Sequence, residues 1–230
     1  MSNLKRNGSL RWTPSYLRRQ GQMTPGQKRI YRDKWDDFGL EFRYGELIDP
    51  AVVFPGDGPL HLEIGFGMGE NLIFQAKTHP EARILGIEVH KPGIGSALKK
   101  IEQEKLGNIR LMRGDARLIL SDYLVEPTRF RQISVLFPDP WPDPESAHRR
   151  IVQDDLLALF EARLSPGGIL HIATDVDVYR DHCLEIVSAR KGWEKAGDYD
   201  GKRMRGPTRY ELKGLEKDHT IHDMVFRWPG

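Results

Sequence analysis

The segment LHLEIGFGMG, residues 60–69, is the part of the chain that decides its fold class. Its first half, LHLEI, has the apolar character of a buried strand, and Gly65, Gly67 and Gly69 then occupy every second position. Glycines at such a place let the backbone turn sharply and approach a ligand closely. The segment therefore predicts a nucleotide-cofactor loop, with a tight strand-to-helix turn that binds nothing as the alternative.

The spacing of the glycines bears on which cofactor the loop would hold. In the dinucleotide fingerprint G-x-G-x-x-G, the third glycine would fall at position 70, which is Glu70 here. Glu63, just before the glycines, would also direct a negative charge toward the place of a pyrophosphate, and like charges in a cleft cost free energy. Both observations favour a cofactor that is cationic at that point, such as S-adenosylmethionine with its ammonium and sulfonium groups.

Length and composition are those of one globular domain. The chain has 230 residues, of which 39% are hydrophobic and 30% charged, which is enough to bury a full core. It has neither a signal-peptide core nor an apolar stretch long enough to cross a bilayer, so we expect no membrane contact and a cytoplasmic location. The single cysteine, Cys183, cannot form an intramolecular disulfide and is predicted to be buried and inert.

The net charge of +2 conceals a strongly basic N-terminal segment. Residues 1–32 contain eight Lys and Arg residues, Arg18 and Arg19 among them, and no acidic residue, with three aromatic residues interleaved. Such a segment suits both the neutralisation of phosphates and stacking on bases. We therefore predict that residues 1–49 form an arm that contacts RNA and orders on it, a solvated tail being the alternative.

From Pro59 onward, short strand-like apolar runs alternate with longer stretches that have helical spacing. This alternation is typical of a parallel sheet with crossover helices, so residues 50–230 are predicted to form one α/β, Rossmann-like sandwich. The expected strands are residues 60–64, 82–89, 108–113, 132–137, 167–174 and 222–228, and the expected helices are residues 72–78, 94–105, 116–124, 152–164 and 178–189.

Acidic residues stand at the ends of four of the expected strands. Glu63 ends the first, Glu88 lies at the end of the second, and Asp115 and Asp139 follow the third and fourth. Taken singly, such an acid is a helix N-cap as often as a ligand contact. In a doubly wound sheet, however, ligands bind beyond the carboxyl ends of the strands, so four acids at one edge predict a site there. Glu88 is placed where a carboxylate accepts the ribose hydroxyls of a nucleotide.

Five motifs, in this order, resemble the bacterial tRNA (guanine-N7)-methyltransferase family. They are EIGFGMG at 63–69, GIEVH at 86–90, GDA at 114–116, FPDPWP at 137–142 and TRYE at 208–211. The first three alone indicate only a class I, S-adenosylmethionine-dependent methyltransferase, whereas the last two are more specific. The arm segment RRQGQMTPGQ and the closing HDMVFRW are also similar to that family, so the resemblance extends over nearly the whole chain.

The resemblance implies a class I methyltransferase sandwich, mostly parallel with an antiparallel last strand. The implied reaction moves a methyl group from S-adenosylmethionine to N7 of a guanine in the tRNA variable loop, position 46 in tRNA numbering. The implied cofactor contacts are Glu63, Gly65, Gly67, Gly69, Glu88, Asp115, Ala116 and Asp139, of which Asp139 is also the implied catalytic residue. The implied substrate contacts are Asp143, Asp175, Thr208, Arg209, Tyr210 and Glu211. RNA phosphates are expected to meet Arg18, Arg19, Arg149 and Arg150, and the cluster Lys202, Arg203, Arg205 and Arg209.

The implied chemistry is simple in its demands. Guanine N7 is a lone-pair acceptor without a proton, so no strong general base is required, and the histidines lack the spacing of metal ligands. The protein must mainly align N7 with the methyl carbon and exclude water. Asp139, placed to accept from the guanine Watson–Crick edge, would hold the base and stabilise it as it becomes cationic. Trp141, in a loop stiffened by prolines, would wall or stack the base.

One position departs from the family pattern, because Asp143 stands where a lysine is expected after FPDPWP. A carboxylate beside a phosphate backbone repels it, so we expect the arm and the cluster at 202–209 to compensate. Two other interpretations stay open: a class I methyltransferase for a small molecule or a protein, and an RNA-binding cofactor sensor without catalysis. The sequence also leaves open whether the protein works as a monomer or a homodimer.

Overall fold

The computed structural model describes residues 15–16, 21–196 and 204–230, and the structural statements below refer to these residues. Arg18, Arg19, Lys202 and Arg203, four of the predicted RNA contacts, lie outside them. Among the described residues, no helix combines the length and the apolar character needed to cross a lipid bilayer.

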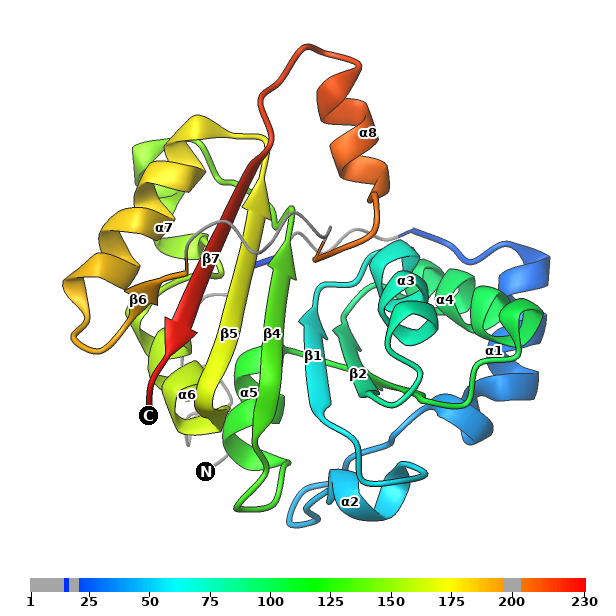
Figure 1. Ribbon diagram of the computed structural model, residues 1–230. Helices are drawn as coiled ribbons and strands as arrows, with labels where there is room; N and C mark the ends of the chain where they lie inside the picture. Colours follow the sequence, from blue (N-terminus) through cyan, green and yellow to red (C-terminus); the bar gives the residue numbers. More distant parts are fainter. Residues whose placement is uncertain (1–14, 17–20, 197–203) are drawn as a thin grey trace.

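Within the described ranges, seven strands form one central sheet in the order β3-β2-β1-β4-β5-β7-β6 (Figure 1). The strands are β1 (Leu60–Ile64), β2 (Arg83–Glu88), β3 (Ile109–Arg113), β4 (Phe130–Leu136), β5 (Leu164–Thr174), β6 (Glu194–Lys195) and β7 (His222–Trp228). β1 to β5 pair in parallel, whereas β7 runs antiparallel to β5 and to β6. The predicted strands and the antiparallel last strand are thus confirmed, and β6 is a two-residue addition.

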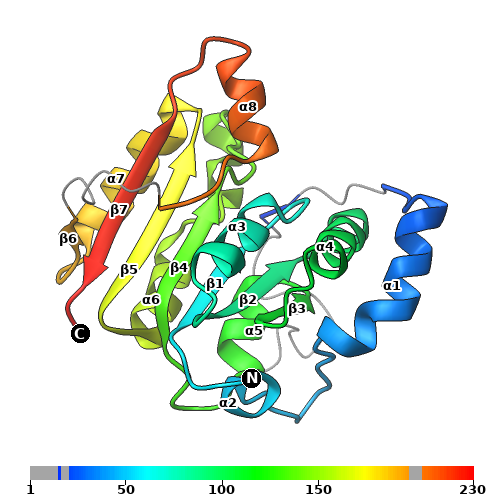
Figure 2. The same ribbon diagram turned by 45° about the vertical axis from the view of Figure 1, so that its right-hand side comes forward.

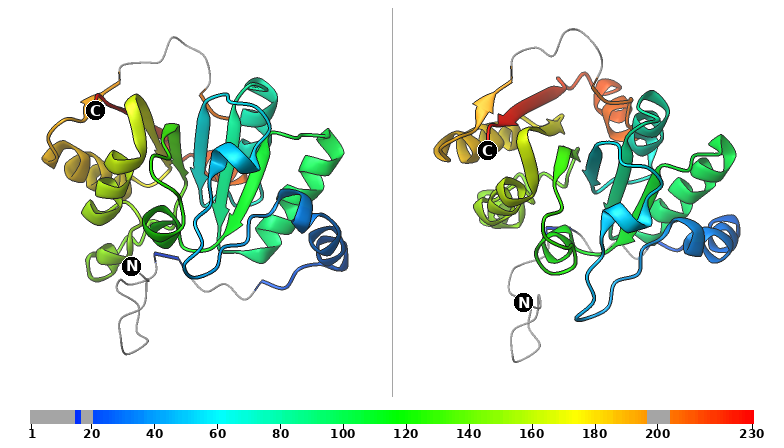
Figure 3. Two further views of the ribbon diagram at one scale, coloured as in Figure 1. Left: turned by 90° about the horizontal axis from the view of Figure 1, so that it is seen from below. Right: turned by 60° about the horizontal axis from the view of Figure 1, so that its bottom comes forward.

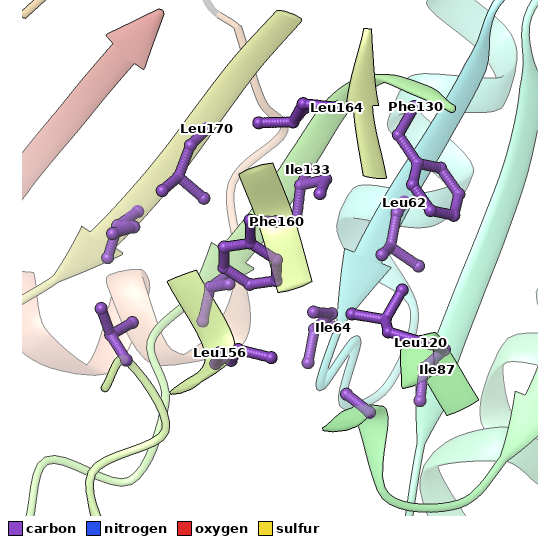
Figure 4. Close-up of a cluster of buried hydrophobic side chains, with 14 of the residues drawn as sticks. Leu62, Ile64, Ile87, Leu120, Phe130, Ile133, Leu156, Phe160, Leu164 and Leu170 are labelled. Carbon is purple, nitrogen blue, oxygen red and sulfur yellow. The ribbon is translucent and has the colours of Figure 1, made fainter. Parts of the chain in front are cut away.

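Helices cover both faces of the sheet (Figure 3). One face carries α3 (Glu70–Thr78) and α4 (Lys91–Glu104), and the other carries α5 (Ala116–Asp122), α6 (Asp154–Arg163) and α7 (Asp177–Ala189). On the second face, Leu156 and Phe160 of α6 lie in a cluster with Ile64, Ile133 and Leu170 of the strands (Figure 4). Covered on both faces, the parallel strands appear in the sequence as continuous apolar runs.

Cys183 belongs to the same buried layer as α6. Its side chain on α7 is fully buried, and burial raises the pKa of its thiol to about 12. The prediction of a buried thiol is confirmed.

The second half of the predicted arm is a helix that packs on the domain. α1 (Pro25–Phe38) begins with a capping box, in which the Thr24 side chain accepts from Gln27 N while the Gln27 side chain accepts from Thr24 N. α1 lies alongside α4 (Figure 2), where Trp35 is buried against the core and Gln27 donates to the carbonyl of Pro92 at 3.0 Å. The contact of residues 1–49 with RNA stays a prediction.

Near the C-terminus, the structure contains a further helix for which the sequence pattern gave no prediction. α8 (Arg209–Leu215) is a short helix beyond the carboxyl ends of β4 and β5 (Figure 1), and the chain returns from it into β7. It too begins with a capping box, formed by Thr208 and Glu211. The motif TRYE therefore forms the N-cap and the first turn of a helix.

Candidate active site

A cleft of about 420 Å³ opens at the carboxyl ends of the parallel strands. One wall comes from the strand ends and the loops after them: Ile64, Gly65, Gly67, Met68, Ile87, Glu88, Val89, His90, Gly114, Asp115, Ala116, Val135, Leu136, Phe137, Pro138 and Asp139. The opposite lip comes from α8 through Arg209, Tyr210 and Lys213, and the remaining lining residues are Ser15, Tyr16 and Ile151. Six of the eight predicted cofactor residues line this cleft. Glu63 and Gly69 do not.

The glycine loop after β1 presents bare backbone to the cleft. Gly65 and Gly67 have φ of 70° and 57°, and a Cβ atom at either would enter open space. L-residues rarely adopt this conformation, and a side chain would occupy the space beside a ligand. Gly69, at φ 84°, instead caps α3, and a Cβ there would stand 2.8 Å from Ala97 Cβ. Gly69 thus lets the start of α3 pack closely against Ala97 of α4, and it does not line the cleft.

Glu88, at the end of β2, fixes the conformation of the glycine loop through hydrogen bonds. Its carboxylate accepts from Gly67 N at 2.8 Å, from Val89 N at 2.7 Å and from His90 N at 2.9 Å. Burial raises the pKa of Glu88, while these three backbone donors oppose the shift. A carboxylate offers about four lone-pair positions, so Glu88 retains acceptor capacity toward the cleft. It can serve both the loop and a ligand hydroxyl.

Asp115 is the N-cap of α5 and also lies at the cleft, and its contact with a ligand stays a prediction. One carboxylate oxygen accepts from Arg117 N at 2.9 Å and so caps α5, and the residue also lines the cleft beside Ala116. A helix N-terminus at this edge adds a positive dipole end.

The FPDPWP loop after β4 brings Asp139 to the cleft, and hydrogen bonds from Arg150 hold the loop in place. Arg150 is only 5% exposed, and its guanidinium donates to the carbonyls of Pro140 at 3.1 Å and Trp141 at 3.1–3.2 Å. This inward position does not suit the predicted contact between Arg150 and RNA. Arg149 stacks over the Trp141 ring at 3.6 Å.

Trp141 does not line the cleft, although the sequence suggested that it would wall the base. Its indole nitrogen donates to the carbonyl of Ser15 at 3.0 Å, which ties the N-terminal segment to the FPDPWP loop. Ser15 and Tyr16 are thereby brought to the mouth of the cleft.

Glu63 faces away from the cleft into a small polar pocket within the fold. Its side chain is 5% exposed and accepts from Asn71 Nδ2 at 2.9 Å. Burial raises the pKa of Glu63 to about 8, against the lowering effect of that hydrogen bond. The acidic groups that face the cleft in this geometry are Glu88, Asp115 and Asp139. A contact between Glu63 and a cofactor stays a prediction.

The TRYE motif divides into an inner and an outer pair. Thr208 and Glu211 are buried in the capping box, and Glu211 also pairs with Arg205 at 2.7 Å. Arg209 and Tyr210, between them, line the cleft. Arg205 was expected at an RNA phosphate, but it is 3% exposed and cannot reach one.

Two further predicted substrate residues lie outside the cleft. Asp143 is exposed just before the 3-10 helix η1 (Pro144–Arg149), where its carbonyl accepts from Ser146 N at 3.0 Å. Asp175, directly after β5, pairs with His219 Nδ1 at 3.0 Å. Their contacts with a substrate stay predictions.

Among the lining residues that were not predicted from the sequence, five have polar or aromatic side chains: Ser15, Tyr16, His90, Phe137 and Lys213. For Lys213 a signal was present. Thr208-x-x-Glu211 is a capping-box pattern that predicts a helix start, and position 213 is then one turn after Arg209 on the same face. His90 and Phe137 lie within the motifs GIEVH and FPDPWP, whereas Ser15 and Tyr16 reach the cleft through the tertiary contact of Ser15 with Trp141.

The cleft is therefore polarised. Three acidic residues, Glu88, Asp115 and Asp139, stand along the strand-end wall, and two basic residues, Arg209 and Lys213, stand on the α8 lip. An acidic wall favours a ligand with positive charge, and a basic lip favours phosphate. One cleft can thus receive a cationic small molecule and a polyanion side by side.

Comparison with known proteins gives this arrangement a family. The model of the family described as "Putative methyltransferase" matches residues 57–224. The tRNA (guanine-N(7)-)-methyltransferase of Alkalilimnicola ehrlichii is 39% identical, over 93% of this chain and 91% of that protein. The enzyme of the same name from Cronobacter sakazakii is 38% identical, over 94% and 92%.

Solved structures agree on the fold. The 16S rRNA methyltransferase KamB superposes with a TM-score of 0.53 at 14% identity, covering 93% of this chain and 97% of KamB. TrmN from Thermus thermophilus superposes with a TM-score of 0.51 at 16% identity, covering 88% of this chain and 48% of TrmN. With the strand order, the polarised cleft and close relatives along nearly its whole length, this chain belongs to the tRNA (guanine-N(7)-)-methyltransferase family.

Proposed function

We propose that the protein transfers a methyl group from S-adenosylmethionine to N7 of a guanine in the variable loop of tRNA, position 46, forming N7-methylguanosine. The observation that carries this proposal is the position of Asp139 on the acidic wall of the cleft, which also has a basic lip. Family membership at 38–39% identity supports the same reaction.

The strand-end wall fits S-adenosylmethionine. The bare backbone of Gly65 and Gly67 leaves room for the methionine part, and Glu88 has acceptor capacity for a ribose hydroxyl. Asp115 and Ala116, which line the cleft at the start of α5, are proposed to contact the adenine side. When bound, the cofactor supplies a methyl group already activated on a sulfonium. Acidic side chains around a cationic ligand lower its free energy in the cleft.

Asp139 is the residue that we propose to hold the guanine. Its carboxylate can accept from N1–H and the exocyclic amine of the base, which leaves N7 on the opposite edge free to receive the methyl group. The N7 lone pair forms the new bond to carbon as the carbon–sulfur bond breaks, and no proton moves. Positive charge passes to the purine ring, so the attraction of Asp139 for the base grows along the reaction.

The lip is proposed to receive the RNA backbone. A base in a folded RNA must be splayed from its stack to enter such a cleft, because the major groove of an RNA helix is too narrow for side chains. Arg209 and Lys213, which line the cleft, are proposed to contact the phosphates that flank the guanine. Arg149, Arg18 and Arg19 are proposed to extend this contact, and they offset the repulsion from Asp143.

The proposal is tested by incubating the protein with methyl-labelled S-adenosylmethionine and an unmodified tRNA transcript, followed by digestion to nucleosides. We expect one labelled nucleoside, N7-methylguanosine, and its loss when the variable-loop guanine is replaced by adenine. Label on tRNA in another nucleoside would contradict the assigned position. Cofactor binding without any methyl transfer to RNA would instead favour a methyltransferase for a small molecule or a protein, or an RNA-binding cofactor sensor without catalysis.

A further inference from the structure

An ionic cluster with three buried members lies at the base of α8, outside the cleft. We call it the Arg205 network; its members are Arg205, Glu211, Asp223 and His171. Arg205 is 3% exposed, Glu211 7% and His171 1%, whereas the side chain of Asp223 is 42% exposed. A charged side chain is seldom buried this deeply unless it is paired, and removing one partner of such a pair is strongly destabilising. The network therefore fixes the relative positions of the segments that contribute to it.

The guanidinium of Arg205 joins α8 to β7. It donates from Nη1 to Glu211 on α8 at 2.7 Å, and from Nε and Nη2 to the two carboxylate oxygens of Asp223 on β7 at 2.7 and 2.9 Å. His171 on β5 pairs with the same Asp223 at 2.7 Å. Such forked, charge-assisted bonds set orientation as well as distance. α8 is thus tied to the sheet by a planar group with little angular freedom.

The residues beside Arg205 are anchored separately on α3. Gln75 donates to the carbonyl of Met204 at 2.6 Å, and Asn71 accepts from Gly206 N at 3.0 Å. A Cβ atom on Gly206 would stand 2.6 Å from Phe74 Cβ, so the backbone passes directly over that side chain. The backbone on both sides of Arg205 is therefore fixed to α3, and α8 is held to this point through the pair of Arg205 with Glu211.

α8 also lies against Asp175, where a Cβ atom on Gly214 would stand 2.9 Å from Asp175 Oδ2, but it buries little apolar surface. It has seven residues, too few for a helix to be stable alone in water. Its buried residues are Glu211 and Gly214, whereas Leu212 and Leu215 are about half exposed. Apolar burial, the usual source of helix docking, is thus largely missing. The ionic contact with Arg205 takes its place.

The same guanidinium also reaches the cleft wall. Its Cζ atom lies 5.2 Å from the centre of the Phe137 ring, and Phe137 lines the cleft two residues before Asp139. We propose that Arg205 is a positioning residue for the methyl transfer, which sets the place of Arg209, Tyr210 and Lys213 at the mouth of the cleft through Glu211. This inference rests on the proposed reaction with tRNA.

The test uses Arg205→Met in the full-length protein, with Arg163→Met as its matched control. Arg163 is 4% exposed and donates to the carbonyls of Leu120, Leu124 and Val125 at the opposite edge of the sheet. Both substitutions remove a buried arginine, and both proteins are assayed well below their melting temperatures. We expect Arg205→Met to raise the KM for tRNA and lower kcat, a combined loss of about tenfold or more, with the Kd for S-adenosylmethionine within about threefold. We expect Arg163→Met to change none of these.

The salt dependence of tRNA binding gives a readout that a merely structural role would not move. Each lost phosphate contact lowers the slope of log Kd against log salt by about 0.7 to 0.9. Arg205 is buried and touches no RNA, so its removal lowers the slope only if it displaces Arg209 and Lys213. Because Arg205→Met leaves two carboxylates without their partner, the charge-balanced Arg205→Met/Glu211→Gln variant is measured as well. We expect the lower slope in both variants.

A double-mutant cycle with Arg209→Met completes the test. If Arg205 acts through α8, the loss from both substitutions together is smaller than the sum of the two separate losses, because the Arg209 contact is already gone. Should Arg205→Met fail to fold, Arg205→Lys, which keeps the charge without the fork, takes its place and is expected to show an intermediate loss. Full additivity, or kinetics and slope equal to those of Arg163→Met, would overturn the inference. Absence of tRNA methylation by the unmodified protein would instead overturn the proposed function.

Discussion

The two sides of the cleft are built by different means. The strand-end wall continues directly from β1, β2 and β4, and its geometry is fixed by backbone turns and by amide hydrogen bonds to Glu88. The α8 lip comes from a short helix that holds its place through buried ion pairs to Arg205. The wall is thus part of the sheet, whereas the lip is an attachment to it.

This difference predicts that the two sides of the cleft bind different ligands. A ligand common to many enzymes of this fold is expected to bind to the wall, because the wall is inherited with the sheet. The polymer substrate is expected to depend on the lip, which the sheet does not dictate. Substitutions on the wall should therefore change cofactor binding or the chemical step, and substitutions on the lip should change the use of tRNA.

The largest effect is expected from Asp139→Asn on the wall. An asparagine keeps the size of the side chain, but it removes the charge that becomes more favourable as the guanine turns cationic. We expect kcat to fall about 10²- to 10³-fold, as for the loss of one group that stabilises transition-state charge. Calorimetric titration should give a Kd for S-adenosylmethionine within about threefold of the original. A variant with unchanged kcat would remove Asp139 from the catalytic role.

The next effect tests the bare backbone of the wall. Gly67→Ala adds a Cβ where the structure has open space and φ is +57°. Strain in the left-handed region costs roughly 1–2 kcal/mol, and the methyl group occupies the space beside the cofactor. We expect the Kd for S-adenosylmethionine to rise about tenfold. Gly56→Ala, at φ +75° with open space but away from the cleft, carries similar strain and should leave that Kd unchanged. Equal Kd values for the two variants would show that the glycine serves the turn alone.

A smaller effect is expected on the lip. Arg209→Met and Lys213→Met should each raise the KM for tRNA about three- to tenfold and lower its salt slope by about one, because each removes one phosphate contact. Lys191→Met, at an exposed position just past α7 and outside the cleft, provides the control. Steady-state kinetics at several salt concentrations measure both quantities. A rise in the Kd for S-adenosylmethionine with no change for tRNA would reverse the division between lip and wall.

The smallest effect on activity is expected from Glu63→Gln, because Glu63 is buried behind the strand-end wall. This substitution is expected to change the pH dependence of stability. The pKa of Glu63 is raised from 4.5 to about 8 by burial, so the folded protein binds a proton that the unfolded chain releases between these values. Its contribution to stability is fully present below pH 4.5 and is lost as the pH rises toward 8. Glutamine does not titrate and keeps an oxygen for Asn71.

Urea unfolding between pH 5 and 8.5 measures this difference. We expect the free energy of unfolding of the original protein to fall relative to the variant over this range, by an amount on the order of a few kcal/mol. Parallel pH profiles for the two proteins would contradict the buried, proton-binding carboxyl.

The sheet could be predicted from the sequence because its signals are local. Apolar runs, glycines after β1 and acids at strand ends all lie next to the structure that they specify, and Glu88, Asp115 and Asp139 do reach one cleft. Both α1 and α8 also carry local capping-box signals, at Thr24 and Thr208, and Pro25 stands at the first position of α1, where proline is favoured.

The buried arginines could not be predicted in this way. Arg150 and Arg205 have the same composition signal as surface arginines, and their partners are decided by the tertiary fold. Asp223, the partner of Arg205, belongs to the last strand and comes near only when β7 pairs with β5. Glu63 likewise has the position of a ligand acid in the sequence, yet Asn71 on α3 binds it inside the fold.

Methylation at N7 is tested by replacing the variable-loop guanosine of a tRNA with 7-deazaguanosine, which has a C–H group in place of N7 and so lacks its lone pair. We expect this tRNA to bind with an unchanged Kd and to receive no methyl group from S-adenosylmethionine, while the unaltered tRNA gains one N7-methylguanosine. Methyl transfer to the 7-deaza tRNA at the usual rate would contradict the proposed reaction, because the acceptor atom would then lie elsewhere.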